Sequence, residues 1–123
     1  FLVMFSGRTL LVIGGGIMQL PLISTAISLG IKVAVVDMNP DAPGIRIADI
    51  KIPVSTRDIP SIVRYIKERK IKIDVVLTVG TDMSYTVAMV GKAIGARALD
   101  ERIARLTTNK YLMRRFLKER GIL

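Results

Sequence analysis

Short apolar runs alternate with amphipathic stretches over most of the chain. Thr9–Ile13, Ile31–Val36 and Asp74–Val79 are runs rich in Val, Ile and Leu, as in parallel strands that are buried on both faces. A shorter run, Asp49–Val54, contains Pro53, which favours an edge position or the end of a strand. These four runs predict the strands of a parallel sheet.

Between and after these runs, apolar residues recur at helical spacing. The predicted helices cover Met18–Leu29, Ile59–Lys70, Ser84–Ile94, a short helix from its cap at Asp100 through Leu106, and Lys110–Arg120, with a single turn near Ile45–Ala48. Gly30, Gly95 and Gly121 follow three of these helices, where glycine commonly ends a helix. The alternation with short connections predicts the α/β class, a Rossmann-like wound parallel β-sheet of about four to five strands with helices on both faces.

The organisation of the chain predicts one complete domain and the beginning of another. Residues 1–106 form the wound domain, and residues 107–123 form a basic amphipathic helix that leads into a further domain. Phe1–Phe5 is an apolar arm with no assigned place in the sheet. Because the chain opens on Phe1 rather than Met, we expect a processed, tagged or longer protein.

The glycine-rich turn after the first strand is the first candidate binding feature. Gly14, Gly15 and Gly16 allow close approach of another group, and the first amides of the next helix point toward them. The turn is a poor dinucleotide fingerprint, because Gln19 stands where the third glycine belongs. Two interpretations therefore stay open: a polar or anionic ligand at the turn, or glycines that only let the helix pack closely on the sheet.

Polar residues follow two further strands, at the edge where wound sheets bind ligands. Asp37 and Asn39 follow the second strand, and Thr81 and Asp82 follow the fourth. Asp37 fits two roles, accepting from a ligand hydroxyl or binding a backbone amide near its own turn. Asp82 fits a ligand contact and is favoured as the N-cap of the next helix.

Composition narrows the classes of function. The chain has no Cys and no His, which excludes disulfides, thiolate chemistry, Cys/His metal sites and His-based catalysis. It shows no nucleophile–base pair, no paired carboxylates and no Walker loop, so no catalytic residue is assigned. The formal net charge of +9 suggests nucleic acid, but no aromatic residues interleave the first basic cluster and no nucleic-acid motif is present. We therefore expect no nucleic-acid partner.

Residues 9–31 carry no charge and reach the length of a membrane helix. The three glycines and Pro21 interrupt this segment, so a strand, turn and helix explain it better than a membrane span. No convincing signal peptide precedes it. We expect no membrane partner and a cytoplasmic location.

Four segments together resemble the amino-terminal domain of ATP-grasp ligases. They are Leu11-Val-Ile-Gly-Gly-Gly-Ile-Met-Gln-Leu-Pro-Leu-Ile23, Val35-Val-Asp-Met-Asn-Pro-Asp-Ala-Pro-Gly44, Thr78-Val-Gly-Thr-Asp-Met-Ser84 and Ala104-Arg-Leu-Thr-Thr-Asn-Lys-Tyr-Leu-Met-Arg-Arg-Phe-Leu-Lys-Glu-Arg-Gly-Ile122. The family includes biotin carboxylase, the ATPase subunit of phosphoribosylaminoimidazole carboxylase, phosphoribosylglycinamide synthetase and the carbamoyl-phosphate synthetase large chain. In such enzymes, ATP phosphorylates a carboxylate or bicarbonate, and a nucleophile attacks the acyl phosphate.

The resemblance implies roles for particular residues. The candidates for contact with a small-molecule acceptor substrate are Gly15, Gly16, Gln19, Asp37, Thr81 and Asp82. Lys110 matches a lysine that reaches ATP phosphates in several members, and Arg105 is a weaker nucleotide-binding candidate. A surface lysine on a basic helix is the alternative for Lys110.

The family's ATP-grasp lobes and its Mg²⁺-binding acidic residues are expected beyond Leu123. The complete enzyme would use ATP and Mg²⁺, and this chain alone is expected to hold neither and to catalyse nothing. It would be an excised fragment, or a split subunit that needs a partner carrying the ATP-grasp domain. Its 50% apolar content also suggests self-association. The alternative function is a stand-alone Rossmann module that senses NAD or another nucleotide.

Overall fold

The computed structural model describes residues 7–98 and 110–121, and its core is a four-stranded parallel sheet. The strands are β1 (Thr9–Ile13), β2 (Lys32–Val36), β3 (Ile50–Ile52) and β4 (Val75–Leu77), in the order β3-β2-β1-β4. The helices are α1 (Leu20–Ser28), α2 (Pro43–Ile47), α3 (Ile59–Glu68), α4 (Ser84–Ile94) and α6 (Lys110–Glu119). The predicted α/β class with a wound parallel sheet is confirmed.

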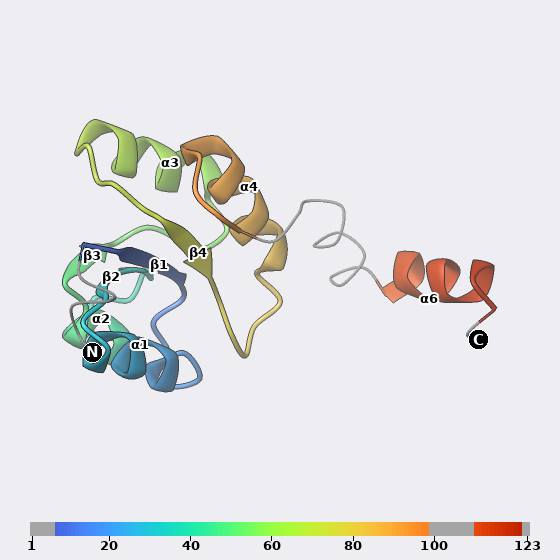
Figure 1. The fold of residues 1–123 in the computed structure, drawn as a ribbon, viewed down its shortest axis with the longest axis horizontal. Helices are drawn as coiled ribbons and strands as arrows, with labels where there is room; N and C mark the ends of the chain where they lie inside the picture. The colour runs from blue at the N-terminus through green and yellow to red at the C-terminus, as the bar shows by residue number, and fades with distance from the viewer. Residues whose placement is uncertain (1–6, 99–109, 122–123) are drawn as a thin grey trace.

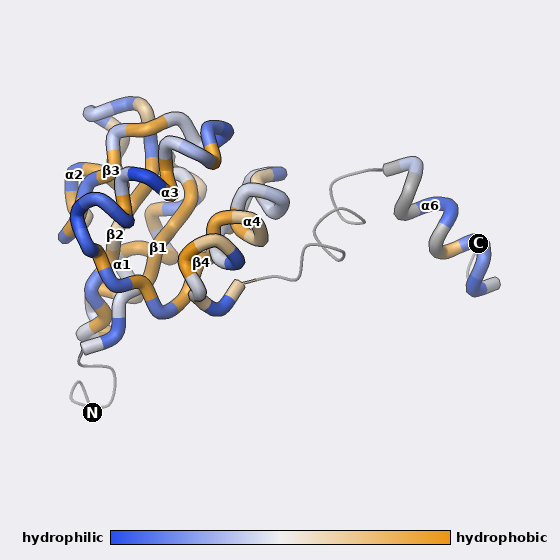
Figure 2. The backbone as a smooth tube through the Cα atoms, turned by 90° about the horizontal axis from the view of Figure 1, so that it is seen from above, coloured by the Kyte–Doolittle hydropathy of each residue, from blue (hydrophilic) through white to orange (hydrophobic). Residues whose placement is uncertain are grey.

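Helices cover both faces of the sheet, as predicted, because successive strand residues point to opposite faces. In Figure 1, α1 and α2 lie below the strands, and α3 and α4 lie above them. Val12 and Val35 pack with Ile23 of α1 on the first face, while Leu11 packs with Ile62 of α3 on the other. Figure 2 shows that apolar residues are concentrated in the central strands. These residues are shielded from water, so β1 and most of β2 are buried.

The strand order creates a switch point between β1 and β4. The chain passes from β1 through α1 to β2 on one side, whereas β4 pairs with the other side of β1. The carboxyl ends of β1 and β4 therefore stand next to each other where the winding direction changes. In open wound sheets, ligands bind in the crevice beyond such a point. Beyond β4, Arg97 makes one further parallel bridge with Val75.

Several element ends match the sequence pattern. Gly30 and Gly95 follow α1 and α4 with φ of 82° and 72°, and β3 with its following Pro53 is an edge strand. Asp58 caps α3 by accepting from the amide of Ser61 at 3.1 Å. The Ser61 hydroxyl donates to Oδ2 of Asp58 at 2.7 Å. This hydrogen bond is the main reason why the pKa of Asp58 lies below its usual value.

The expectation that Asp82 caps α4 is wrong. The N-cap of this helix is Met83, and no side chain bonds the free amides of the cap. Other expectations lie outside the described residues: the arm at 1–5, the short helix at 100–106, and the boundary between 106 and 107. The expected division into residues 1–106 and 107–123 therefore stays a prediction.

Candidate functional site at the carboxyl edge of the sheet

The glycine turn after β1 is held by three hydrogen bonds from its own amides. Gly14 donates to the carbonyl oxygen of Val36 at 2.8 Å. The amide of Gly15 donates to Oδ2 of Asp37 at 2.9 Å, and that of Gly16 donates to Oε1 of Gln19 at 2.9 Å. The turn is thus fixed to β2 on one side and to the start of the next helix on the other.

Gln19 connects the glycine turn to the loop after β4. Its side-chain Nε2 donates to the carbonyl oxygen of Val79 at 2.7 Å while its Oε1 accepts from Gly16. Gln19 is only 6% exposed. Because both ends of this buried amide are used inside the protein, Gln19 joins two loops across the switch point.

The same two loops also pack against each other through Met18 and Gly80. A Cβ added at Gly80 would lie 2.8 Å from Cβ of Met18, and Gly80 has a φ of 65°. Both conditions require glycine at this position. Thr78, which also follows β4, donates from Oγ1 to the carbonyl oxygen of Ile13 at 2.7 Å. Gly80 and Thr78 were not among the predicted site residues, although both lie in the segment Thr78–Ser84.

Asp37 is half-buried at the end of β2 and accepts two backbone hydrogen bonds. Oδ2 accepts from Gly15, and Oδ1 accepts from the amide of Asn39 at 2.9 Å. It thus both caps its own turn and binds a neighbouring amide, as one of the two interpretations had it. In residues 7–98 and 110–121, no Lys or Arg forms an ion pair with it. Each oxygen keeps acceptor capacity for a ligand donor.

A second close contact, between Gly44 and Gly15, joins α2 to the glycine turn. The amide of Gly44 donates to the carbonyl oxygen of Gly15 at 2.6 Å. A Cβ at Gly44 would lie 2.8 Å from Cα of Gly15, and one at Gly15 would lie 2.8 Å from Cγ1 of Val35. Gly15 therefore serves close packing between the turn, β2 and α2. The sequence analysis named Gly15 but missed Gly44.

Thr81 and Asp82 are exposed in the loop between β4 and α4. The structure brings Gly15, Gly16, Gln19 and Asp37 into one bonded cluster, whereas no hydrogen bond between described residues joins Thr81 or Asp82 to it. Both lie at the same edge of the sheet as that cluster, because their loop follows the carboxyl end of β4.

The nucleotide-binding candidates lie apart from this cluster in the sequence. Lys110 is the first residue of α6, a helix in which Arg115 and Glu119 pair at 3.2 Å. The side chain of Lys110 and the whole of Arg105 lie outside what the structure describes. Within the described ranges, no group of three or more acidic side chains is placed to bind a metal ion. No helix in those ranges is long and apolar enough to cross a membrane.

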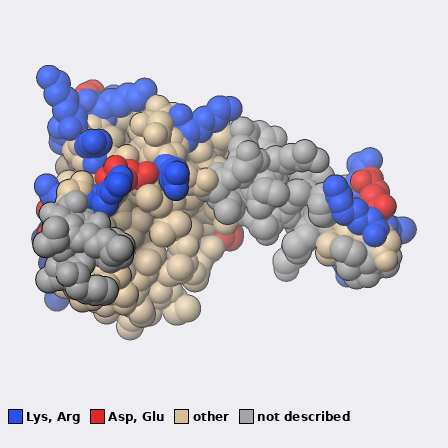
Figure 3. All heavy atoms as spheres, in the orientation of Figure 1, with Lys and Arg blue, Asp and Glu red and all other residues tan. Residues whose placement is uncertain are grey.

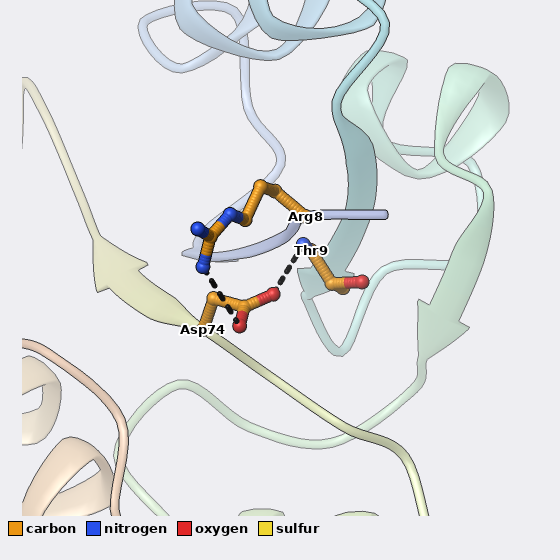
Figure 4. Close-up of polar contacts among 3 residues, drawn as sticks. All are labelled: Arg8, Thr9 and Asp74. Carbon is orange, nitrogen blue, oxygen red and sulfur yellow. Dashed lines mark hydrogen bonds and ion pairs between the residues drawn. The ribbon is translucent and has the colours of Figure 1, made fainter. Parts of the chain in front are cut away.

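A cavity of about 740 Å³ lies elsewhere, beside the amino ends of β1 and β4. Leu22 and Ala26 of α1 and Val75 and Leu77 of β4 line its apolar part, and Arg8 stands at its rim. Figure 4 shows Arg8 and Asp74 pointing toward each other at 3.8 Å, with Oδ2 of Asp74 accepting from the amide of Thr9 at 2.8 Å.

This cavity is lined by none of the predicted site residues. It is the part of the sheet face over β4 that α1 leaves uncovered. Four of the predicted site residues meet instead at the carboxyl edge, which is the edge where wound parallel sheets bind ligands.

The fold defined by this sheet and glycine turn is similar to that of part of several solved synthetases and ligases. Phosphoribosylglycinamide synthetase from Anaerococcus prevotii superposes with a TM-score of 0.76 and 24% identity, over 91% of this chain and 28% of that one. N5-carboxyaminoimidazole ribonucleotide synthetase from Thermotoga maritima gives 0.74 and 23%, over 94% and 31%. L-amino acid ligase from Bacillus licheniformis gives 0.74 and 19%, over 94% and 31%.

The predicted resemblance to ATP-grasp enzymes is therefore confirmed at the level of the fold. The chain spans less than a third of the length of these three proteins. No protein-family model matches the chain, and a comparison with curated proteins gives no match.

Proposed function

We propose that the chain is the substrate-side domain of an ATP-dependent ligase that works through an acyl phosphate. In this reaction a carboxylate oxygen takes the γ-phosphoryl group of ATP, and ADP leaves. A nucleophile then attacks the acyl carbon and displaces phosphate, and an amine nucleophile loses its proton to a base or to water. The domain would bind the acceptor substrate at the carboxyl edge of its sheet.

The main support is the match of nearly the whole domain to proteins of this reaction class. Between 91% and 94% of this chain is covered by the superposition on each of the three ligases and synthetases. The chain spans less than a third of their length, so ATP and Mg²⁺ would be held by a larger ATP-grasp portion, in the same polypeptide or in a partner subunit. Use of ATP and small metabolites fits a cytoplasmic reaction.

The alternative of an NAD-sensing module has less support. A dinucleotide needs free amides at the glycine turn for its pyrophosphate. Here the amides of Gly14, Gly15 and Gly16 already bond to Val36, Asp37 and Gln19. Tight NAD binding by this chain that is abolished in Asp37→Ala would favour the sensing module instead. Self-association also stays a prediction, which sedimentation over a range of concentrations would check.

The role of Lys110 offers a direct test of the ligase proposal. Lys110 opens α6, and the dipole at the start of a helix favours an anion and slightly disfavours the ammonium group of Lys110. A phosphate of ATP would supply the anion that the helix start favours, and it would offset the cost of placing the ammonium group there. In a protein that joins this domain to its ATP-grasp portion, we expect Lys110→Ala to weaken ATP binding and ADP formation, with a smaller effect on acceptor affinity.

Lys118→Ala is the matched control, because Lys118 lies in the last turn of the same helix. It should change neither quantity. If both variants bind ATP as tightly as the unchanged protein, Lys110 has no nucleotide role. If the joined protein forms no ADP with any carboxylate and amine, the ligase proposal is wrong.

A further inference from the structure

The strand β4 is covered by described helices on only one face of the sheet. Val76 points to the face where α3 and α4 pack, and it is fully buried. Val75 and Leu77 point to the opposite face, because successive strand residues alternate. On that face α1 packs over β1 and β2, and Leu77 keeps 41% of its surface exposed. This uncovered part of the sheet is the apolar floor of the cavity of about 740 Å³.

The cavity has the size and the lining of a small-molecule pocket. Such pockets commonly enclose roughly 300–1,000 Å³ and are lined mainly by apolar side chains, with a few polar groups that fix the ligand. Here Leu10 extends the floor, and Leu22 and Ala26 of α1 form a wall. Apart from Thr25 of α1, the polar lining residues stand where β1 and β4 begin: Arg8, Thr9, Lys72, Asp74 and Arg97.

The polar end of the cavity has a net positive charge. Asp74 pairs with Arg8 at 3.8 Å and accepts from the amide of Thr9, so its charge is already balanced. Lys72 and Arg97 are exposed, and neither forms an ion pair with a residue that the structure describes. The backbone fixes Arg97 here, because its amide donates to the carbonyl oxygen of Asp74 at 3.0 Å. Two cations therefore stand beside the apolar floor.

The amino edge of the sheet is basic as a whole, and the carboxyl edge is not. Lys32 adds a further cation where β2 begins. By contrast, the loops after the four strands carry four aspartates and one arginine, in residues 14–19, 37–42, 53–58 and 78–83. In Figure 3, basic side chains gather over the upper part of the body, where the chain enters β4 in Figure 1, and the lower part is almost free of them. Such an uneven field selects ligands by the sign of their charge.

We propose that this cavity binds a single-chain anionic amphiphile, such as the carboxylate of a free fatty acid. The alkyl chain lies on the floor between α1 and β4, where its burial removes apolar surface of both the ligand and Leu77 from water. The carboxylate lies at the amino end, where Lys72 and Arg97 donate charge-assisted hydrogen bonds. This ligand site is independent of the proposed ligase reaction, whose acceptor would bind at the opposite edge of the sheet.

The charges at the cavity favour this occupant over the alternatives. A second copy of the chain, packed cavity to cavity about a twofold axis, would bring the same cations against each other. A cationic amphiphile would meet the same repulsion. A small anion without an alkyl chain can pair with Lys72 and Arg97, but it leaves the apolar floor in contact with water. An anionic group joined to an apolar chain fits both parts of the cavity.

The test is a titration of the 123-residue chain, followed by amide signals in two-dimensional ¹H–¹⁵N NMR spectra. The probes are decanoate below the concentration at which it forms micelles, decyltrimethylammonium with the same alkyl chain, and acetate without that chain. We expect decanoate to shift the signals of Leu10, Ala26 and Val75 in a saturable manner. The other two probes should bind about tenfold more weakly, because each lacks one of the two interactions.

Variants separate the two parts of the cavity. The double variant Lys72→Gln/Arg97→Gln should weaken the affinity for decanoate about tenfold, and it keeps the fold because both side chains are exposed. Leu22→Gln should weaken it about threefold, because it places a polar amide in the apolar wall. Lys32→Gln and Ile27→Gln are the matched controls and should leave the affinity unchanged, since neither residue lines the cavity. The spectrum of each variant reports directly whether it is folded.

Each other outcome overturns the inference without touching the ligase proposal, which the Lys110 variants test. Equal binding of decanoate and decyltrimethylammonium, or unchanged binding of decanoate by the double variant, would show an apolar surface without charge selection. Acetate shifts equal to those of decanoate would show a diffuse counter-ion effect. If the signals move with protein concentration alone, a second copy covers the cavity. If the chain sediments with phosphatidylglycerol vesicles while free decanoate shifts nothing, the partner is a lipid surface. If no probe moves the signals, the cavity is not a ligand site.

Discussion

Two aspartates hold β1 at its opposite ends, and they differ in whether their charge is neutralised by an ion pair. Asp74 precedes β4 and accepts from the amide of Thr9 at 2.8 Å, while Asp37 follows β2 and accepts from the amide of Gly15 at 2.9 Å. The charge of Asp74 is balanced by Arg8 at 3.8 Å. Asp37 instead accepts a second amide and forms no ion pair with a described residue.

An aspartate that accepts a hydrogen bond from a backbone amide therefore has a different consequence at each edge. At the amino edge a carboxylate joins two strands and its charge is neutralised locally. At the carboxyl edge a carboxylate joins a strand to a glycine turn, and no described Lys or Arg neutralises its charge. A hydrogen bond that looks purely structural can in this way also set the local charge at a sheet edge.

The largest expected effect comes from overfilling the close contact between Gly44 of α2 and Gly15 of the glycine turn. A Cβ in Gly44→Ala would lie 2.7 Å from the carbonyl oxygen and 2.8 Å from Cα of Gly15, which are backbone atoms. We expect a loss of about 3 kcal/mol in the free energy of unfolding, at the upper end for overpacking, measured by urea denaturation. Gly16→Ala is the control, because its Cβ would meet only the Gln19 side chain, at 3.2 Å. Equal losses in both variants would contradict the packing argument.

The next effect concerns the amide that links the glycine turn to β4. Gln19→Ala leaves the amide of Gly16 and the carbonyl of Val79 without these partners. Unsatisfied buried groups cost about 1–3 kcal/mol, and these two groups are only partly buried, so we expect a loss of about 1.5 kcal/mol in unfolding free energy. Hydrogen exchange should also become faster at Gly16. An unchanged exchange rate there would show that Gln19 does not hold the turn.

A direct contrast of the two aspartates should give a smaller effect with a different salt dependence. Asp37→Asn and Asp74→Asn each keep one acceptor oxygen, so we expect each to cost about 1 kcal/mol in unfolding free energy. For Asp74→Asn the deficit should shrink as salt is added, because the pair with Arg8 is screened in the unchanged protein. For Asp37→Asn it should persist. The opposite salt dependence would reverse the roles assigned to the two edges.

The smallest effect is expected at Asp58, a carboxylate at the same edge that serves only its own helix. Hydrogen bonds from Ser61 hold the pKa of Asp58 below its usual value, so the folded state favours the ionised form. Its contribution to stability is therefore complete above the ordinary pKa of an aspartate and disappears as pH falls through the lowered pKa. Asp58→Ala should lower the midpoint of thermal unfolding slightly at pH 7 and not at all in strong acid. A pH-independent difference would exclude this role.

The sequence pattern predicted the bounds of strands and helices well where those bounds depend on neighbouring residues in the chain. β1 matches its predicted bounds, and Gly30 and Gly95 end helices with positive φ as expected. Asp82 was misassigned because the backbone of the loop, rather than the residue type, places the N-cap at Met83. β4 is shorter than predicted, since Thr78 and Val79 leave the ladder to bond Ile13 and Gln19.

The meeting of several candidate residues at one edge was predicted, but their hydrogen-bond partners were not. Topology alone brings the loops after β1, β2 and β4 to one edge. The partners of Gln19 and Gly15 could not be found from the sequence, because Val79 is 60 residues from Gln19 and Asp37 is 22 from Gly15. The contact of Gly44 with Gly15 depends on how α2 packs, which no local pattern encodes.

The central claim, that the two edges of the sheet differ in charge, can be measured without any ligand. Amide protons of the chain are relaxed by dissolved nitroxide radicals, one form cationic and the other anionic, and the ratio of the two effects reports the local potential. We predict that the exposed residues Asn39 and Thr81 are relaxed more by the cationic radical, and that Lys72 and Arg97 are relaxed more by the anionic one. A positive potential at Asn39 and Thr81 as well would contradict the account.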